Sequence, residues 1–149
     1  MENLKSIEEI ENEIVEDFKL LDAWDEDQKY EYIIDMGKKL APLDDVYKTP
    51  DNVIKGCQST VWLASDFSDG KVLFKADSNS VITKGLISML IQVLSGNTPD
   101  EIIAAKLDFI NKIGMHSALA QTRSNGLLAM VKQMKNYALA YKLKNAAKV

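Results

Sequence analysis

Apolar residues recur every three or four positions between residues 7 and 40, which is the spacing of one face of a helix. Ser6 and Glu9 form a capping-box pattern at the start of the first run. Its apolar positions are Ile7, Ile10, Ile14, Phe18 and Leu21. The second predicted helix extends from about Asp25 to Leu40 and ends before Pro42, with Tyr30, Ile33, Ile34, Gly37 and Leu40 on its inner face. Because glycine costs about 1 kcal/mol relative to alanine in a helix interior, Gly37 predicts close packing against another element.

After a predicted loop over residues 43–52, the pattern changes to that of strands. Residues 53–55 and 59–64 indicate a strand interrupted at Gly56-Cys57. Residues 71–76 indicate a further strand, with Val72, Phe74 and Ala76 on one side. The turn cluster over residues 66–70 contains Asp-Gly, a dipeptide typical of tight hairpins. The pattern therefore favours an antiparallel hairpin.

The remaining segments predict helices. Residues 81–95 are apolar almost all round, which is typical of a buried helix, and Gly96 suits the position just after its end. Thr98-Pro99-Asp100-Glu101 combines an N-cap, a first-turn proline and a capping-box glutamate, so a fourth helix is expected from there to about Lys112. A last helix is expected from about Ser124, with Leu127, Val131, Met134, Ala138 and Tyr141 on its stripe. Together these elements predict a single α+β domain over residues 1–149, a small antiparallel sheet with helices packed on its faces.

Composition narrows the choice of function and location. The 149 residues carry a net charge of −4, which argues against nucleic acid as a partner because phosphate binding requires a basic surface. No apolar run is long enough to span a membrane, and the N-terminus has no signal-peptide pattern. We therefore expect a cytoplasmic protein with no membrane partner, whose lone cysteine is free in a reducing compartment.

Cys57 is the only cysteine, and the simplest interpretation of such a residue is an inert, buried, small apolar side chain. Its neighbour Gly56, however, can flex the backbone at the end of a strand. A mobile thiolate can exchange sulfur without a base, a metal or an oxyanion hole in its own chain. The product of such an exchange is a persulfide, and the apolar side chains of residues 61–63 would shelter it. Metal binding is not expected, since one cysteine and one histidine are too few ligands. The chain also has no glycine-rich phosphate-binding motif, which disfavours nucleotide binding.

Arg123 is the only arginine among 18 cationic residues. Lysine cannot reproduce the planar, two-pronged hydrogen bonding of a guanidinium group, so this arginine indicates a cluster of carboxylate or carbonyl groups. It either anchors the start of a helix or takes a direct part in chemistry. A further interpretation, a thiol hydrolase that pairs Cys57 with His116, depends on the only histidine in the chain.

Several segments resemble one known family in the same order. Residues 52–63, Asn-Val-Ile-Lys-Gly-Cys-Gln-Ser-Thr-Val-Trp-Leu, resemble the signature of the SufE/CsdE family of sulfur acceptors. The hairpin of residues 63–76, the Lys84-Gly85-Leu86 triplet, the helix start at residues 98–102 and Thr-Arg-Ser-Asn-Gly-Leu at residues 122–127 resemble further motifs of that family. The resemblance covers nearly the whole chain.

The resemblance implies a SufE/IscU-like fold and a persulfide carrier rather than a self-sufficient enzyme. Cys57 would take sulfane sulfur from a PLP-dependent cysteine desulfurase of the SufS type, with Gly56, Gln58, Ser59 and Arg123 in support. The sulfur would pass to an iron–sulfur scaffold complex of the SufBCD type, or elsewhere in the CsdE branch. The chain itself would hold no cofactor and would be a monomer or weak dimer. IscU-type scaffolds carry three cysteines, so one cysteine excludes the scaffold role.

Three departures from the family pattern stand out. Ser78-Asn79-Ser80 occurs where Ser-Asp-Ala is usual, which removes a carboxylate near the thiol loop. Leu119-Ala120-Gln121 occurs where Leu-Ser-Pro is usual, and residues 23–24 and 29–30 differ from the usual Asp-Trp and Arg-Tyr. An alternative function is that of a non-covalent binding module, which activates a desulfurase allosterically without using its thiol.

Overall fold

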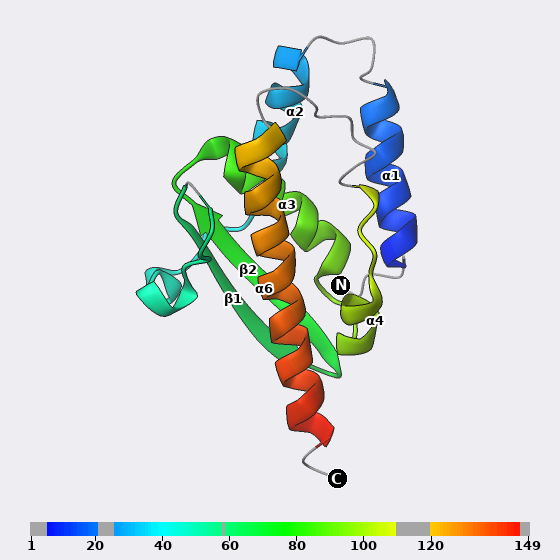
Figure 1. Ribbon diagram of the computed structural model, residues 1–149, viewed down its shortest axis with the longest axis vertical. Coiled ribbons are helices and arrows are strands. Elements are labelled where there is room, and N and C mark those ends of the chain that lie inside the picture. Colours follow the sequence, from blue (N-terminus) through cyan, green and yellow to red (C-terminus); the bar gives the residue numbers. More distant parts are fainter. Residues whose placement is uncertain (1–5, 21–25, 58, 110–119, 147–149) are drawn as a thin grey trace.

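The computed structural model describes residues 6–20, 26–57, 59–109 and 120–146, with the backbone alone for 26–27, 120–125 and 146. Its elements in chain order are α1 (Ile7–Leu20), α2 (Glu26–Lys38), η1 (Asp45–Tyr47), η2 (Pro50–Asn52), β1 (Val61–Ser68), β2 (Lys71–Ser78), α3 (Val81–Leu94), α4 (Pro99–Ala104) and α6 (Ala120–Ala146). The arrangement confirms the predicted α+β class, a small antiparallel sheet with helices packed against it (Figure 1).

The hairpin has the register that its turn residues impose. β1 and β2 pair antiparallel from Val61 opposite Ser78 to Ser68 opposite Lys71. Asp69 and Gly70 make the two-residue connection with φ angles of 53° and 78°, a left-handed pair that suits the right-handed twist of a hairpin. β1 begins two residues after the predicted start at residue 59 and continues four residues past the predicted end at residue 64. β2 continues two residues past the predicted end at residue 76.

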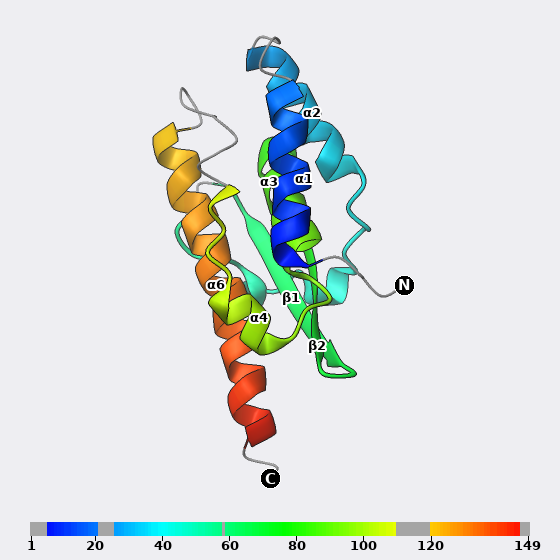
Figure 2. The ribbon, with the colours of Figure 1, turned by 90° about the vertical axis from the view of Figure 1, so that its right-hand side faces the viewer.

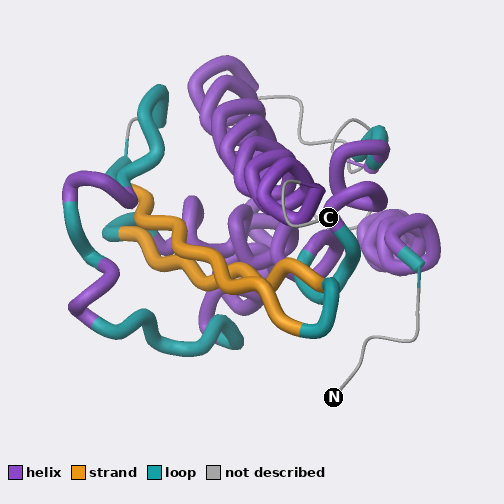
Figure 3. The backbone as a smooth tube through the Cα atoms, turned by 90° about the horizontal axis from the view of Figure 1, so that it is seen from below, coloured by secondary structure: helices purple, strands orange, loops and turns teal. Residues whose placement is uncertain are grey.

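Alternation along the strands separates an apolar face from a polar one. The inward positions are Val61, Leu63, Val72, Phe74 and Ala76, all of them buried. Tyr137 of α6 donates a hydrogen bond from its hydroxyl to the Leu63 carbonyl at 3.2 Å, and Tyr141 stacks on Phe67 at 5.0 Å between ring centroids. On the polar face, the ammonium of Lys48, the residue after η1, lies 5.5 Å from the centroid of the Trp62 ring. Figure 3 shows the strands between α6 and the segment with η1 and η2.

The contact between α2 and α3 is tight enough to require glycine. A Cβ added to Gly85 would lie 2.0 Å from the carbonyl oxygen of Ile33, and one added to Gly37 would lie 2.8 Å from the Gly85 nitrogen. Within the same contact, the Ser88 hydroxyl donates to the Met36 carbonyl at 2.9 Å. The close packing predicted at Gly37 is therefore confirmed.

A continuous apolar core joins the hairpin to the helices. Figure 1 shows α3 between α6 and α1, and in Figure 2 α1 lies in front of α3 with α6 to the left. The predicted inner positions of α1, Ile10, Ile14 and Phe18, are buried. Leu127, Met134 and Ala138 are buried on the predicted stripe of α6. Leu21 lies outside the described residues.

Several predicted boundaries are wrong. Residues 53–55 form no strand: Val53 makes an isolated bridge with Trp62, and the Ile54 N–H donates to the Val61 carbonyl at 2.9 Å. The loop predicted over 43–52 contains two short 3₁₀ turns, η1 and η2. The last helix begins at Ala120 rather than near Ser124.

The helix predicted from residue 98 to about Lys112 ends at Ala104. Its start is confirmed, because the Thr98 hydroxyl accepts from the Glu101 N–H at 3.2 Å and the Glu101 carboxylate accepts from the Thr98 N–H at 3.1 Å. At the other end, the Lys135 ammonium of α6 donates to the carbonyls of Ile103 and Ala105. These carbonyls are thereby satisfied from another helix, and the chain turns away with an extended Ala105.

Candidate functional site

Cys57 lies in a short loop closed at its base by backbone contacts. The Ile54 N–H bonded to the Val61 carbonyl and the Val53–Trp62 bridge hold the two ends of the loop together. Ile54 is buried and anchors the entry to the loop. Gly56 has a φ of +94°, a conformation that favours glycine because it lacks a Cβ. The loop therefore needs glycine immediately before the cysteine.

The loop presses the cysteine against α6. The Cys57 thiol donates to the Gly126 carbonyl at an Sγ–O distance of 3.7 Å. The side chain is half-buried and packs against the apolar core. A Cβ added to Gly56 would lie 3.5 Å from the Cβ of Ala129, so the backbone of the loop also approaches the helix. Burial raises the pKa of the Cys57 thiol, so this position favours the neutral thiol over the thiolate.

The far side of the loop is tied to the end of β2. The Thr60 N–H donates to the Asn79 side-chain oxygen at 3.1 Å, and the Asn79 N–H donates to the Thr60 carbonyl at 3.3 Å. The Ser78 hydroxyl donates to the same carbonyl at 2.8 Å. Asn79 is one of the departures noted in the sequence. The side-chain oxygen of Asn79 accepts the hydrogen bond from the Thr60 N–H, so this bond does not require the carboxylate of the usual aspartate.

Ser59 and Ser80 connect the loop region to the start of α3. The Thr83 hydroxyl donates to the Ser59 hydroxyl at 3.4 Å. Ser80 is the N-cap of α3, and its hydroxyl accepts from the Thr83 N–H. The Ser80 departure from the usual alanine therefore supplies a helix cap, because serine is among the preferred N-cap residues. Of the predicted site residues, Gly56, Cys57 and Ser59 lie together in this loop.

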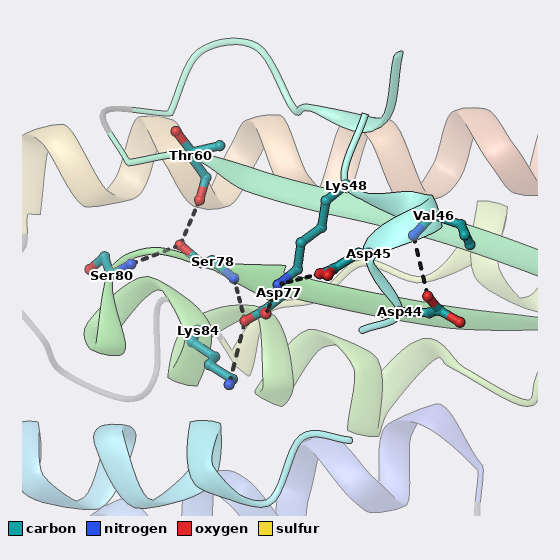
Figure 4. A network of polar contacts seen from close by, with 9 residues as sticks. All are labelled: Asp44, Asp45, Val46, Lys48, Thr60, Asp77, Ser78, Ser80 and Lys84. Atoms are coloured by element: carbon teal, nitrogen blue, oxygen red, sulfur yellow. Dashed lines mark hydrogen bonds and ion pairs between the residues drawn. The ribbon is translucent and has the colours of Figure 1, made fainter. Parts of the chain in front are cut away.

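A charged cluster lies beside the loop on the polar face of the hairpin (Figure 4). Asp77 of β2 forms ion pairs with Lys48 at 3.1 Å and with Lys84 at 3.4 Å. Its carboxylate also accepts the Ser78 N–H at 2.8 Å. Burial alone would raise the pKa of Asp77, but these hydrogen bonds and positive charges outweigh it and lower the pKa. The cluster joins the residue after η1 to β2 and α3, and Asp77 lies opposite Trp62, whose bridge to Val53 closes the base of the Cys57 loop.

Sequence reasoning named some of these residues and missed others. Lys84 belongs to one of the family motifs, whereas no sequence pattern indicated a role for Asp77. Gly126 belongs to the motif of residues 122–127, but within that motif the sequence indicated a role only for Arg123, three positions earlier. The signal that was available is the glycine itself, since a glycine seven residues into a long helix needs a local reason.

The structure does not bring every predicted residue into the site. Gln58 and His116 lie outside the described residues. Arg123 contributes its described backbone to the first turns of α6, three residues before Gly126. Across the part of the chain that is described, no group of three or more His, Cys, Asp and Glu residues is placed to hold a metal ion. Within the same residues, no helix is both long and apolar enough to cross a membrane.

Residues 12–138 match the family model of SufE, which is described as an Fe-S metabolism associated domain. The chain belongs to the SufE family. Membership in this family supports a role in the sulfur handling of iron–sulfur metabolism. It confirms the resemblance carried by the cysteine segment and the later motifs.

Individual relatives extend the same similarity. SufE-like protein 1, chloroplastic/mitochondrial, of Arabidopsis thaliana is 40% identical over 144 residues, which are 95% of this chain but 39% of the plant protein. An uncharacterised SufE-like protein of Synechocystis is 39% identical over 80% of this chain and 75% of its own length. Another from Rhizobium meliloti is 34% identical over 85% of this chain and 93% of its own length. This chain thus corresponds to most of the two bacterial SufE-like proteins and to a part of the plant one.

A solved structure supports the fold. The solution structure of a hypothetical protein from Thermus thermophilus covers 88% of this chain and 94% of its own length with a TM-score of 0.69. Its sequence identity is 17%, so the likeness concerns the fold alone.

Proposed function

We propose that this SufE-family protein accepts sulfane sulfur from a cysteine desulfurase as a persulfide on Cys57 and passes it on for iron–sulfur cluster assembly. The observation that carries the proposal is the placement of Cys57. It lies on a loop closed by the Ile54–Val61 hydrogen bond, with its sulfur half-buried against α6. A thiol in such a loop is sheltered at rest, and its long 3.7 Å hydrogen bond to the Gly126 carbonyl is weak enough to break when the loop moves.

The transfer exchanges one sulfur–sulfur bond for another. The Cys57 thiolate attacks the outer sulfur of a persulfide on the desulfurase cysteine. The bond between the two sulfurs of the donor breaks, a new sulfur–sulfur bond forms on Cys57, and the electron pair leaves on the donor cysteine as a thiolate. The proton of the Cys57 thiol leaves before the attack. No external oxidant or reductant is needed, because the sulfane sulfur moves between two equivalent positions.

The resting position opposes this first proton loss. Burial and the Gly126 carbonyl acceptor both favour the neutral thiol, whereas the attacking species is the thiolate. We therefore expect productive transfer to require the loop to move away from α6 when the desulfurase binds. Gly56 would serve as the hinge, since its positive φ can change without a side-chain clash.

The other predicted residues have supporting roles in this proposal. Gln58 and Ser59 follow the cysteine and would contact the partner when the loop opens. Arg123, in the first turns of α6, would be a further supporting residue, as the family motif of residues 122–127 implies. Asn79 would hold the end of the loop during the movement, through its hydrogen bond from the Thr60 N–H.

The proposed partners are those that the family resemblance implies. The donor would be a SufS-like desulfurase, which holds PLP on its own chain, and the recipient would be a SufBCD-like scaffold complex. This chain would need no cofactor for the transfer. A cytoplasmic location stays a prediction, and one relative carries chloroplastic/mitochondrial in its name.

The test is the intact mass of the protein after incubation with a cysteine desulfurase and L-cysteine, followed by alkylation. The wild type is expected to gain one sulfur atom that Cys57→Ser does not gain, while circular dichroism shows the same fold for both proteins. No added sulfur with a desulfurase from the same organism would contradict the proposal. If Cys57→Ser still stimulates desulfurase turnover as strongly as the wild type, the protein is instead a non-covalent activator.

A further inference from the structure

One glycine of α6 faces the sulfur of Cys57. Gly126 is buried and lies seven residues into the 27-residue helix. Apart from proline, glycine is the least favourable residue for a helix interior, and Gly126 does not have the positive φ that would require it. Its backbone conformation therefore does not explain the glycine, and the reason must lie in its surroundings.

The surroundings of Gly126 contain the sulfur. Cys57 Sγ, at 3.7 Å, is the one heavy atom found within 4 Å of a Cβ added to this glycine, among described residues other than its chain neighbours and nearby helix backbone. By contrast, the added Cβ at Gly85 meets the backbone of another helix at 2.0 Å. The missing side chain at Gly126 thus leaves space next to the sulfur and to little else.

The reduced thiol does not need this space. A separation of 3.7 Å between carbon and sulfur is an ordinary van der Waals contact, so alanine would fit beside the thiol. A persulfide is larger, because its second sulfur lies about 2.05 Å from the first. Directed along the 3.7 Å line to the Gly126 carbonyl oxygen, the second sulfur would come within roughly 2 Å of that oxygen. The second sulfur must therefore point away from this oxygen, and the neighbouring Cα of Gly126, which carries no side chain, leaves space for it.

We propose that Gly126 is a positioning residue for the persulfide, and that its missing side chain provides the space in which the outer sulfur of the charged Cys57 is sheltered. This inference rests on the proposed function, which supplies the persulfide. The backbone at Gly56 also approaches the helix one turn further along, since a Cβ added there would lie 3.5 Å from the Cβ of Ala129, so the loop lies close to α6 on both sides of this space. Alanine at position 126 would leave the thiol in place but displace the outer sulfur toward solvent.

The experiment charges the protein without a desulfurase. Inorganic polysulfide transfers one sulfur to the Cys57 thiolate, which becomes a persulfide while the polysulfide is shortened by one atom. After the excess is removed, cyanide takes the outer sulfur, and thiocyanate and the free Cys57 thiolate are the products. The rate of thiocyanate formation measures access to the outer sulfur. The rate of iodoacetamide alkylation of the uncharged protein measures access to the thiol.

Wild type, Gly126→Ala and Gly126→Ser are compared, with Leu128→Ala as the matched control because its side chain lies on the same helix and is 64% exposed. Both Gly126 variants are expected to release thiocyanate about tenfold faster than the wild type, with alkylation rates within about twofold. Leu128→Ala is expected to match the wild type in both rates. Circular dichroism checks that each variant is folded, and Gly126→Ala gains helix propensity.

Two results would overturn the proposal. One is an unchanged rate of thiocyanate release in folded Gly126 variants. The other is an equal acceleration of alkylation and of thiocyanate release, which would show that the side chain simply loosens the loop. A wild-type protein that is charged by polysulfide but not by a desulfurase would contradict the proposed function while leaving this comparison interpretable.

Discussion

Replacing Gly85 with alanine has two effects of opposite sign on the free energy of unfolding. Helix propensity by itself predicts that Gly85→Ala stabilises α3 by about 1 kcal/mol. Packing predicts the reverse, because the added Cβ would lie 2.0 Å from the Ile33 oxygen, 2.6 Å from Ile33 Cγ2 and 2.7 Å from the Ile33 carbonyl carbon. Two of these atoms belong to the backbone, so rotation of a side chain cannot relieve the clash, and α2 must move away from α3.

The magnitude follows from the contacts that this movement disturbs. Overpacking a core costs typically 1–3 kcal/mol, and a backbone obstacle places this site at about the upper end. Separation of the helices also weakens the 2.9 Å hydrogen bond from Ser88 to the Met36 carbonyl, worth about 1 kcal/mol. After subtraction of the gain in propensity, we expect a net loss of about 3 kcal/mol in the free energy of unfolding.

Urea denaturation followed by far-ultraviolet circular dichroism measures this loss as a lower midpoint at constant slope. Gln92→Ala on the exposed side of the same helix is the control, with an expected change within about 0.5 kcal/mol. A Gly85→Ala protein as stable as the wild type, or more stable, would refute the argument that the helix contact requires glycine.

Two further predictions concern pH. Burial raises the pKa of Cys57 above that of the unfolded chain, so the free energy of unfolding should fall as the pH rises past about 8.5, and fall less in Cys57→Ser. Asp77 has a lowered pKa because Ser78, Lys48 and Lys84 outweigh its burial, so stability should fall as the pH decreases below about 3.9. Asp77→Asn should weaken that acid dependence and cost about 1 kcal/mol at neutral pH, both measured by urea denaturation, and an unchanged acid profile would contradict the role of the ion pairs.

Predictions from the sequence succeeded where the cause is local. The hairpin turn at Asp69-Gly70 and the capping box of Thr98 and Glu101 depend on residues within a few positions of one another, and both occur as expected. Predictions failed where a distant residue decides the outcome. The end of α4 is an example, since Lys135 satisfies carbonyl groups about thirty residues earlier in the chain.

The candidate site divides in the same way. The sequence by itself singles out Cys57, places Gly56 before it and matches the SufE family over residues 12–138. Which groups surround the sulfur is decided by tertiary packing, because Gly126 is 69 residues away and reaches the thiol only when α6 lies against the loop. The raised pKa of the thiol depends on the same contact, since desolvation requires that other parts of the chain exclude water from it.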